Sequence, residues 1–183
     1  MTTDSQPASV YDLAHDEAPE NLATFAVLVD NEPGVLHRLV GLFAARGYNI
    51  ESLTVAETDH RAHTSRVTIV TRGTPQVLAQ IEAQLEKMVS TRHVQDVTRD
   101  PNGLERELAL VKVRGAGADR VEALRVAEIF RAKVIDTTHE SFVFEVTGAS
   151  SKIDSFIELM RPLGLVEVSR TGVLSIQRGA RPL

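Results

Sequence analysis

Apolar residues follow two different spacings along residues 23–99. Four stretches have the β-branched, apolar or alternating composition of strands, and they cover residues 23–30, 49–58, 66–71 and 92–98. Two runs between them place apolar residues three and four positions apart, which is the spacing of one face of an α-helix. These runs are Leu36, Leu39, Val40 and Phe43, then Leu78, Ile81, Leu85 and Met88. The pattern predicts the order β-α-β-β-α-β, which is a ferredoxin-like unit.

Turn and cap residues fall where the predicted elements begin and end. Asn31-Glu-Pro-Gly34 interrupts the first strand, and Gly47 takes the position that a glycine usually occupies after a helix. Thr74 followed by Pro75 combines a capping side chain with a proline at the first helical position. We therefore expect the first helix to lie between the two glycines and the second to begin at the proline.

The same order of patterns recurs after Asp100-Pro-Asn-Gly103, which is a strong turn signal. Strand patterns cover residues 105–114, 134–138, 141–147 and 166–176, the last as one strand or a hairpin. One helix is expected over residues 119–132, with an apolar face of Val121, Leu124, Ala127 and Phe130. Ser151 is expected to cap another helix, whose apolar face is Ile153, Phe156, Ile157 and Met160. The predicted fold class is α+β, with two tandem ferredoxin-like βαββαβ units.

Charge separates the N-terminal end from the rest of the chain. There are 20 basic and 25 acidic residues, which gives a net charge of −5. Five of the acids lie in residues 1–22, which have no Lys or Arg, so the remaining 20 acids balance the 20 bases. We expect residues 1–22 to be a disordered acidic leader. The other expected parts are a first unit at 23–99, a linker at 100–103, a second unit at 104–178 and a tail at 179–183.

Composition excludes several classes of protein. The chain has no cysteine, which excludes disulfides, thiolate metal sites and cysteine nucleophiles and fits a reducing cytoplasm. The longest apolar stretch, residues 39–45, is far shorter than the roughly 20 residues that cross a bilayer. The balanced body offers no basic field for nucleic acid or an anionic membrane. Since the leader carries no positive charge, it is neither a secretory signal nor a transit peptide. We expect a cytoplasmic protein that binds neither nucleic acid nor membranes.

The start of the first predicted helix is the most informative feature for binding. Pro33-Gly34 leaves N–H groups unpaired at the positive end of the helix dipole, and a glycine without a Cβ lets a carboxylate approach them. The side-chain oxygen of Asn31 is suited to accept a hydrogen bond from an ammonium group. Together these residues suit the two polar ends of an amino acid. The alternative is structural: Asn31 caps the helix and Pro33-Gly34 makes the turn.

Two other candidate sites do not fit their motifs. Gly115-Ala-Gly117 follows a strand and precedes a helix, as in dinucleotide-binding loops, but Arg120 replaces the third glycine of that motif. Solvated side chains, and no metal, are expected in the polar turn that holds Glu57, Asp59, His60 and His63. No serine or threonine stands in a nucleophile-elbow context. The sequence proposes no catalytic centre and no cofactor for this chain.

Residues 31–55 carry a specific resemblance to a known family. The segments Asn31-Glu-Pro-Gly-Val-Leu36 and Gly41-Leu-Phe-Ala-Ala-Arg-Gly-Tyr-Asn-Ile-Glu-Ser-Leu-Thr-Val55 resemble the ACT domain of the small regulatory subunit of acetolactate (acetohydroxyacid) synthase. Further similar segments are Ser65–Ile69, Arg106–Leu108, Leu110–Val113, Ile129–Arg131, Val134–Asp136 and Glu167–Gly172. The resemblance covers about residues 23–179. It implies an N-terminal ACT domain followed by an ACT-like domain.

This resemblance implies a non-catalytic protein. It would activate a catalytic large subunit that uses thiamine diphosphate, Mg²⁺ and FAD to condense two pyruvates, or pyruvate with 2-oxobutyrate, in branched-chain amino-acid synthesis. It would also confer feedback inhibition, usually by valine. The effector would lie between two ACT domains of a homodimer. One protomer would offer Asn31, Pro33, Gly34, Val35 and Leu36, and the other Asn49 and Ile50.

Other classes of function fit less well. A stand-alone amino-acid-sensing ACT regulator of transcription would need a helix-turn-helix and a basic face, and the balanced charge provides no such face. An ACT regulator of another enzyme stays open as an alternative. An enzyme in its own right would need a nucleophile, a metal set or a phosphate loop. The sequence does not specify which branched-chain amino acid binds best, or which surface meets the catalytic subunit.

Overall fold

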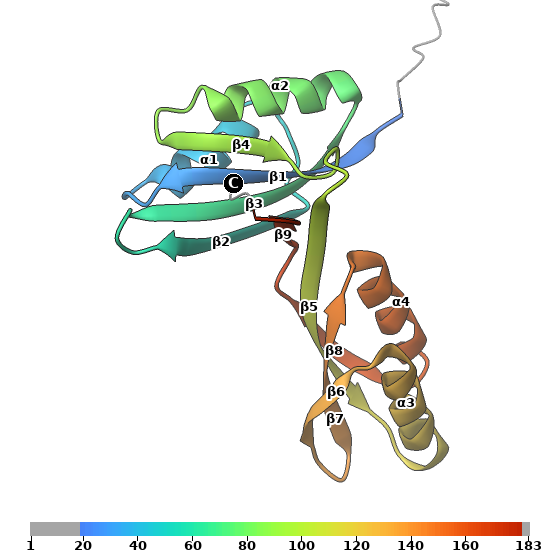
Figure 1. The fold of residues 1–183 in the computed structure, drawn as a ribbon. Helices are drawn as coiled ribbons and strands as arrows, with labels where there is room; N and C mark the ends of the chain where they lie inside the picture. The colour runs from blue at the N-terminus through green and yellow to red at the C-terminus, as the bar shows by residue number, and fades with distance from the viewer. Residues whose placement is uncertain (1–18, 181–183) are drawn as a thin grey trace, which may run out of the picture.

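Two packed units make up the chain in this computed structural model, which describes residues 19–180 (Figure 1). In each unit, two helices pack on a β-sheet and enclose a core of their own. The predicted α+β fold of two tandem ferredoxin-like units is confirmed. Most of the predicted leader, residues 1–18, and residues 181–183 of the predicted tail lie outside the described residues.

The first unit is a four-stranded antiparallel sheet in the order β2-β3-β1-β4. Its elements are β1 (Asn21–Asp30), α1 (Val35–Ala44), β2 (Ser52–Asp59), β3 (Thr64–Gly73), α2 (Pro75–Glu86) and β4 (Thr91–Asp96). β1 begins two residues before the predicted start of the first unit, and it pairs with strands on both sides, as its apolar composition predicts. Thr74 caps α2 by accepting a hydrogen bond of 3.3 Å from Val77 N–H, and Pro75 opens the helix as predicted.

The buried face of α1 differs from the prediction. The helix buries Val35, Leu39 and Phe43 against the sheet. Leu36 and Val40, which the spacing also assigned to that face, are 40% and 38% exposed. The true face is rotated because Val35, the first helical residue, is the one that joins the core. Two apolar side chains are therefore left on the surface of α1.

A Schellman motif ends α1. Gly47 has a φ of 68°, and its N–H donates to Ala44 O at 3.3 Å, while Tyr48 N–H donates to Phe43 O at 3.0 Å. The predicted role of Gly47 is confirmed. The following strand was predicted to start at Asn49, but regular pairing in β2 begins only at Ser52.

The second unit has a sheet in the order β6-β7-β5-β8, and β9 pairs with β5 beside that path. Its elements are β5 (Gly103–Arg114), α3 (Gly117–Phe130), β6 (Lys133–Thr137), β7 (Ser141–Gly148), α4 (Ser150–Met160), β8 (Leu165–Arg170) and β9 (Leu174–Gln177). Val121 was predicted to be buried and is 53% exposed, because α3 packs through Ala123, Val126 and Ala127. Ser151 is not a cap: α4 begins at Ser150, and no side chain caps it.

β5 runs from beside the first unit into the second (Figure 1). Its first residues, 103–106, pair with β9, and residues 107–114 pair with β7. β8 pairs with β5 at residues 109–113. The predicted final segment is therefore two strands that both run antiparallel to β5, and not a hairpin.

The two-stranded ribbon of β9 and the start of β5 lies against the first unit. At one end of β9, Val173 N–H donates to Ser52 Oγ in β2 at 3.2 Å. At the other end, Gln177 donates to the Asp100 carboxylate, which also accepts a hydrogen bond of 2.8 Å from Gln95 in β4. Because β2 and β4 are the two edge strands of the first sheet, the ribbon crosses that sheet from edge to edge.

Candidate functional site

The start of α1 is open to a ligand. Gly34 precedes the helix in the left-handed conformation, with a φ of 85°, and no side chain caps the helix. Val35 N–H donates to Glu32 O at 3.3 Å, but the amides of Leu36 and His37 donate to no group within residues 19–180. These N–H groups lie at the positive end of the helix dipole, where anions bind. The alternative in which Asn31 caps the helix is wrong, although its backbone N–H donates to His63 O at 2.7 Å.

Glu32 is anchored away from the helix start. Its carboxylate accepts a hydrogen bond of 2.6 Å from Ser90 Oγ and pairs with Arg38. The hydrogen bond from Ser90 and then the charge of Arg38 hold the pKa of Glu32 below its ordinary value. The negative charge closest in sequence to Gly34 is thus already paired, and a ligand carboxylate would not face a free one there.

Asn49 and Ile50 lie in the segment that leads into β2. The side-chain amide of Asn49 donates to Glu51 Oε1 at 3.1 Å, and its backbone carbonyl accepts a hydrogen bond of 2.6 Å from Thr71 Oγ1. The Asn49 side chain is exposed, and Ile50 is half-buried against the first core. This segment therefore presents one amide and one apolar side chain on a backbone fixed to β3.

The two predicted groups of site residues do not meet in one chain. Asn31, Pro33, Gly34, Val35 and Leu36 gather at the start of α1. Asn49 and Ile50 follow the other end of the same helix, which at 10 residues and about 1.5 Å per residue is roughly 15 Å long. A site that uses both groups needs two protomers.

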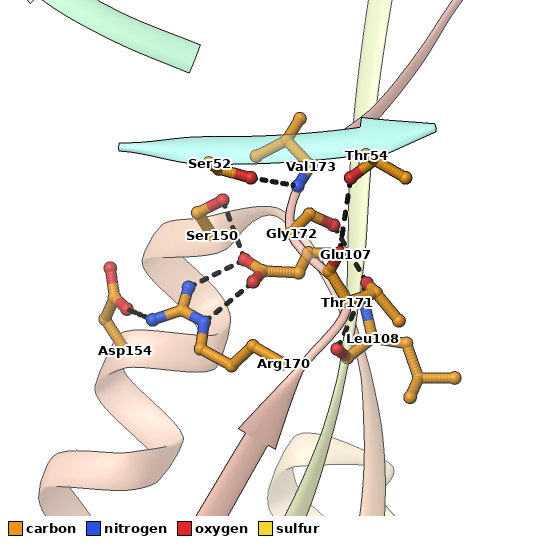
Figure 2. A network of polar contacts seen from close by, with 10 residues as sticks. All are labelled: Ser52, Thr54, Glu107, Leu108, Ser150, Asp154, Arg170, Thr171, Gly172 and Val173. Atoms are coloured by element: carbon orange, nitrogen blue, oxygen red, sulfur yellow. Dashed lines mark hydrogen bonds and ion pairs between the residues drawn. The ribbon is translucent and has the colours of Figure 1, made fainter. Parts of the chain in front are cut away.

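A second polar cluster joins the two units (Figure 2). Arg170, at the end of β8, binds Glu107 of β5 and donates to Asp154 Oδ1 of α4 at 2.7 Å. Ser150 adds a hydrogen bond of 3.1 Å to Glu107. Thr171 follows at once, and its carbonyl accepts a hydrogen bond of 3.2 Å from Thr54 Oγ1 in β2. The cluster lines a cavity of about 490 Å³ between the units.

Glu107 is a charged residue at a buried position of β5 where the neighbouring inward-facing residues are apolar. It continues the inward-facing row of Ala109, Val111 and Val113 along β5, and only 4% of its side chain is exposed. Burial alone raises the pKa of Glu107, but the hydrogen bonds and charge of Arg170 outweigh burial, so its pKa is lowered. The same contacts raise the pKa of Arg170. Both groups are therefore ionised at neutral pH.

Two family models match the chain. One describes an acetohydroxyacid synthase small subunit-like ACT domain and matches residues 25–93; the other describes the small subunit of acetolactate synthase and matches residues 106–179. A probable acetolactate synthase small subunit from Archaeoglobus fulgidus is 46% identical over 156 residues, which cover 85% of this chain and 96% of the relative. The chain belongs to the acetolactate synthase small-subunit family.

Other members of this family agree in sequence and in structure. The acetolactate synthase isozyme 3 small subunit of Escherichia coli is 45% identical over 155 residues, which cover 84% of this chain and 94% of the relative. The crystal structure of the small subunit from Thermotoga maritima is similar with a TM-score of 0.78 and 38% identity, covering 88% of this chain and 99% of that one. The predicted resemblance is confirmed. A small subunit of this synthase implies a catalytic large subunit as its partner.

The remaining candidate residues take ordinary structural roles. His60 Nδ1 lies 2.7 Å from Glu57 in an exposed turn, and Asp59 accepts hydrogen bonds from the amides of Arg61 and Ala62. Over residues 19–180, no group of three or more His, Asp or Glu is arranged to hold a metal. In the same range, none of the helices has the length and apolar character needed to span a membrane.

Sequence reasoning missed the polar cluster between the units. One signal was present: the alternation that makes Ala109, Val111 and Val113 face inward also turns Glu107 inward, and a buried carboxylate needs a partner. No spacing identifies that partner as Arg170, which lies 63 residues further along the chain.

Proposed function

We propose that the chain is the non-catalytic regulatory subunit of an acetolactate synthase. It activates the thiamine-diphosphate-dependent catalytic subunit and makes it sensitive to feedback inhibition by valine or another branched-chain amino acid. The observation that carries this proposal is the start of α1, where left-handed Gly34 precedes amides without partners in the described part of the chain. Such amides bind carboxylates.

A homodimer through the edge strand β2 would complete the effector site. Among the described strands, β2 pairs only with β3, so its outer edge offers free N–H and C=O groups. Asp59 of β2 and Asp30 of β1 both pair with Thr64, so the end of β2 lies at the same end of the sheet as the start of α1. In a two-fold antiparallel pair of β2 strands, the start of one lies beside the end of the other. Asn49 and Ile50 of one protomer would thereby approach the helix start of its partner.

Each part of a branched-chain amino acid has a matching group in this arrangement. The carboxylate accepts hydrogen bonds from the amides of Leu36 and His37. The ammonium donates to the side-chain oxygen of Asn31, which is exposed. The branched side chain packs against Leu36 from one protomer and Ile50 from the other. Asn49 adds a polar contact from the second protomer.

Reconstituted acetolactate formation tests this function. The purified chain alone is expected to give no acetolactate from pyruvate and thiamine diphosphate, to raise the rate of the large subunit, and to let L-valine lower that rate. Calorimetry with L-valine, L-leucine and L-isoleucine measures binding directly, and D-valine is the control because it cannot direct both polar groups and the side chain to the same partners. Binding of none of the three amino acids would contradict the effector assignment.

The same experiment separates the other functions. A regulator of another enzyme or of transcription would bind an amino acid without changing acetolactate formation. Turnover of pyruvate by the purified chain alone would support an enzyme instead. The family membership and the α1 start favour the regulatory subunit.

A further inference from the structure

Residues 170–173 hold both units through one short segment. On the N-terminal side, Val173 N–H donates to Ser52 Oγ and Thr54 Oγ1 donates to Thr171 O, each at 3.2 Å. Ser52 and Thr54 are the first and third residues of β2, so both contacts fall where that strand starts (Figure 2). The start of β2 is also the strand end that follows Asn49.

The same segment is fixed to the second unit. Arg170 pairs with Glu107 of β5 and Asp154 of α4. Thr171 N–H donates to Leu108 O at 3.0 Å, and its Oγ1 accepts a hydrogen bond of 3.2 Å from Leu108 N–H. Thr171 and Val173 thus bind β2, while Thr171 and Arg170 bind the second unit. Because these residues are adjacent in sequence, a displacement of the β2 start is expected to move Arg170 and its partners as well.

Glu51 connects the proposed effector site to the joint, by which we mean the contact of residues 170–173 with the start of β2. It accepts the side-chain hydrogen bond of Asn49 at 3.1 Å, and it lines the cavity between the units together with Ser52 and Arg170. An effector that engages the amide of Asn49 competes with Glu51 for that donor. Occupancy of the site therefore changes the surroundings of a carboxylate directly before Ser52.

We infer that residues 170–173 form a clasp, which fixes the second unit on the start of β2 and carries effector occupancy at Asn49 to that unit. That the clasp fixes the second unit on β2 follows from contacts within one chain. That it transmits effector occupancy, which we call the signal, rests on the function proposed above, so the two claims need separate measurements.

Gly172 offers a direct way to open the clasp. It has a φ of 80°, and a Cβ added there would collide with Ser52 Oγ and lie 3.0 Å from Thr54 Oγ1. Gly172→Ala is therefore expected either to push the segment off β2 or to turn Ser52 Oγ away, and either change breaks the hydrogen bond from Val173 N–H. Gly179→Ala is the matched control, because Gly179 has a φ of 94° and an added Cβ there meets no atom of residues 19–180 within 4 Å. Thr54→Val removes the hydrogen bond to Thr171 with little change of shape, and serves as the second variant if Gly172→Ala does not fold.

Distances between spin labels test the clasp without an effector. The chain has no cysteine, so Ala83→Cys in α2 and Glu128→Cys in α3 create only two labelling sites, both exposed. Diluting the labelled chain in excess unlabelled chain leaves only distances within one chain. A single narrow distribution is expected for the parent and for Gly179→Ala, and a broader or displaced one for Gly172→Ala and Thr54→Val. Unchanged distributions in both of the latter would overturn the clasp.

Calorimetry and reconstituted acetolactate formation test the signal. Gly172→Ala is expected to bind valine within about threefold of wild type and to activate the large subunit, yet to need at least about tenfold more valine for half-inhibition, within the usual range of allosteric coupling. Gly179→Ala should respond as wild type does. Unchanged valine inhibition in a Gly172→Ala protein with altered label distances would overturn the signal. A wild-type chain that binds no branched-chain amino acid would overturn the proposed function and the signal together, while the label distances still decide the clasp.

Discussion

Arg170 holds the carboxylate of Glu107 through two hydrogen bonds, from Nε at 2.7 Å and from Nη2 at 2.6 Å. A bidentate guanidinium–carboxylate pair is both strong and directional. Since Glu107 is almost fully buried, its charge is stabilised at this inward-facing position of β5 by the pair with Arg170. Arg170 is also the last residue of β8 and the first residue of the clasp.

Arg170→Met is expected to destabilise the chain by about 2–3 kcal/mol. The substitution leaves the Glu107 charge buried without its partner, which usually costs about 3–5 kcal/mol, and the partial exposure of Arg170 reduces the loss. For a chain of this size, thermal unfolding should shift down by roughly 5–10 °C. Arg161→Met is the control, because the Arg161–Glu158 pair is exposed and should contribute less than about 1 kcal/mol. Equal shifts for both variants would contradict this account of Glu107.

Stability should fall in acid through Glu107. Its pKa is lowered in the folded chain, so its contribution is complete above the ordinary value of 4.5 and is lost as the pH falls through the folded-state value. The difference in melting temperature between wild type and Glu107→Gln is therefore expected to be large at neutral pH and to shrink below pH 4.5. Glu158→Gln, which changes an exposed pair, should have nearly the melting temperature of wild type at each pH. A difference for Glu107→Gln that does not depend on pH would rule out ionisation as its cause.

The order of elements could be predicted from sequence because apolar spacing reports whether a segment is helix or strand. The same spacing assigned Leu36 to the buried face of α1, where packing of Val35 rotates the helix instead. The capping signal at Ser151 was also wrong: α4 starts at Ser150, two residues before the first helical residue that a Ser151 cap predicts, and the side chain of Ser150 donates to Glu107 instead. Local signals report single elements, and the contacts of one element with another correct them.

The candidate site likewise has one part that could be predicted from the sequence and one part that could not. The open start of α1 could be predicted because Pro33-Gly34 is a local feature with a local consequence. The joint between the units could not, because Ser52 and Val173 are 121 residues apart and neither belongs to a motif of its own. The two residues meet because the 170–173 segment is fixed to β5 on one side of Val173 by Thr171 and Leu108, and on the other side by the pairing of β9 with β5.

Gly34→Asp is expected to abolish valine inhibition while leaving activation of the large subunit intact. A Cβ at Gly34 meets no described atom within 4 Å, so the substitution causes left-handed strain of about 1 kcal/mol and no clash within one chain. A carboxylate at a helix start recovers about 0.3–1 kcal/mol, so the fold should persist. The aspartate would compete for the amides that bind the effector carboxylate. Acetolactate formation against rising valine measures the effect.

Gly34→Ala separates charge from strain in this experiment. It imposes the same backbone strain without a carboxylate, so it is expected to keep most of the response to valine. If both variants lose inhibition equally, the conformation of the loop and not competition by charge is responsible. A folded Gly34→Asp protein as sensitive as wild type would mean that the effector does not bind at the start of α1.

A mixture of two insensitive variants should test whether the effector site spans two protomers. Asn49→Ala removes the polar contact from the second protomer, so alone it should lose valine inhibition as Gly34→Asp does. In a mixed dimer, one site combines both substitutions, and the other combines the intact helix start of one chain with the intact Asn49 of its partner. Random mixing makes about half of the dimers mixed, with one intact site each, so about a quarter of the wild-type valine sites should return in calorimetry. A sample of either variant alone should show no valine binding in calorimetry. If the site lay within a single chain, every chain in the mixture would carry a defect, and mixing would restore no binding.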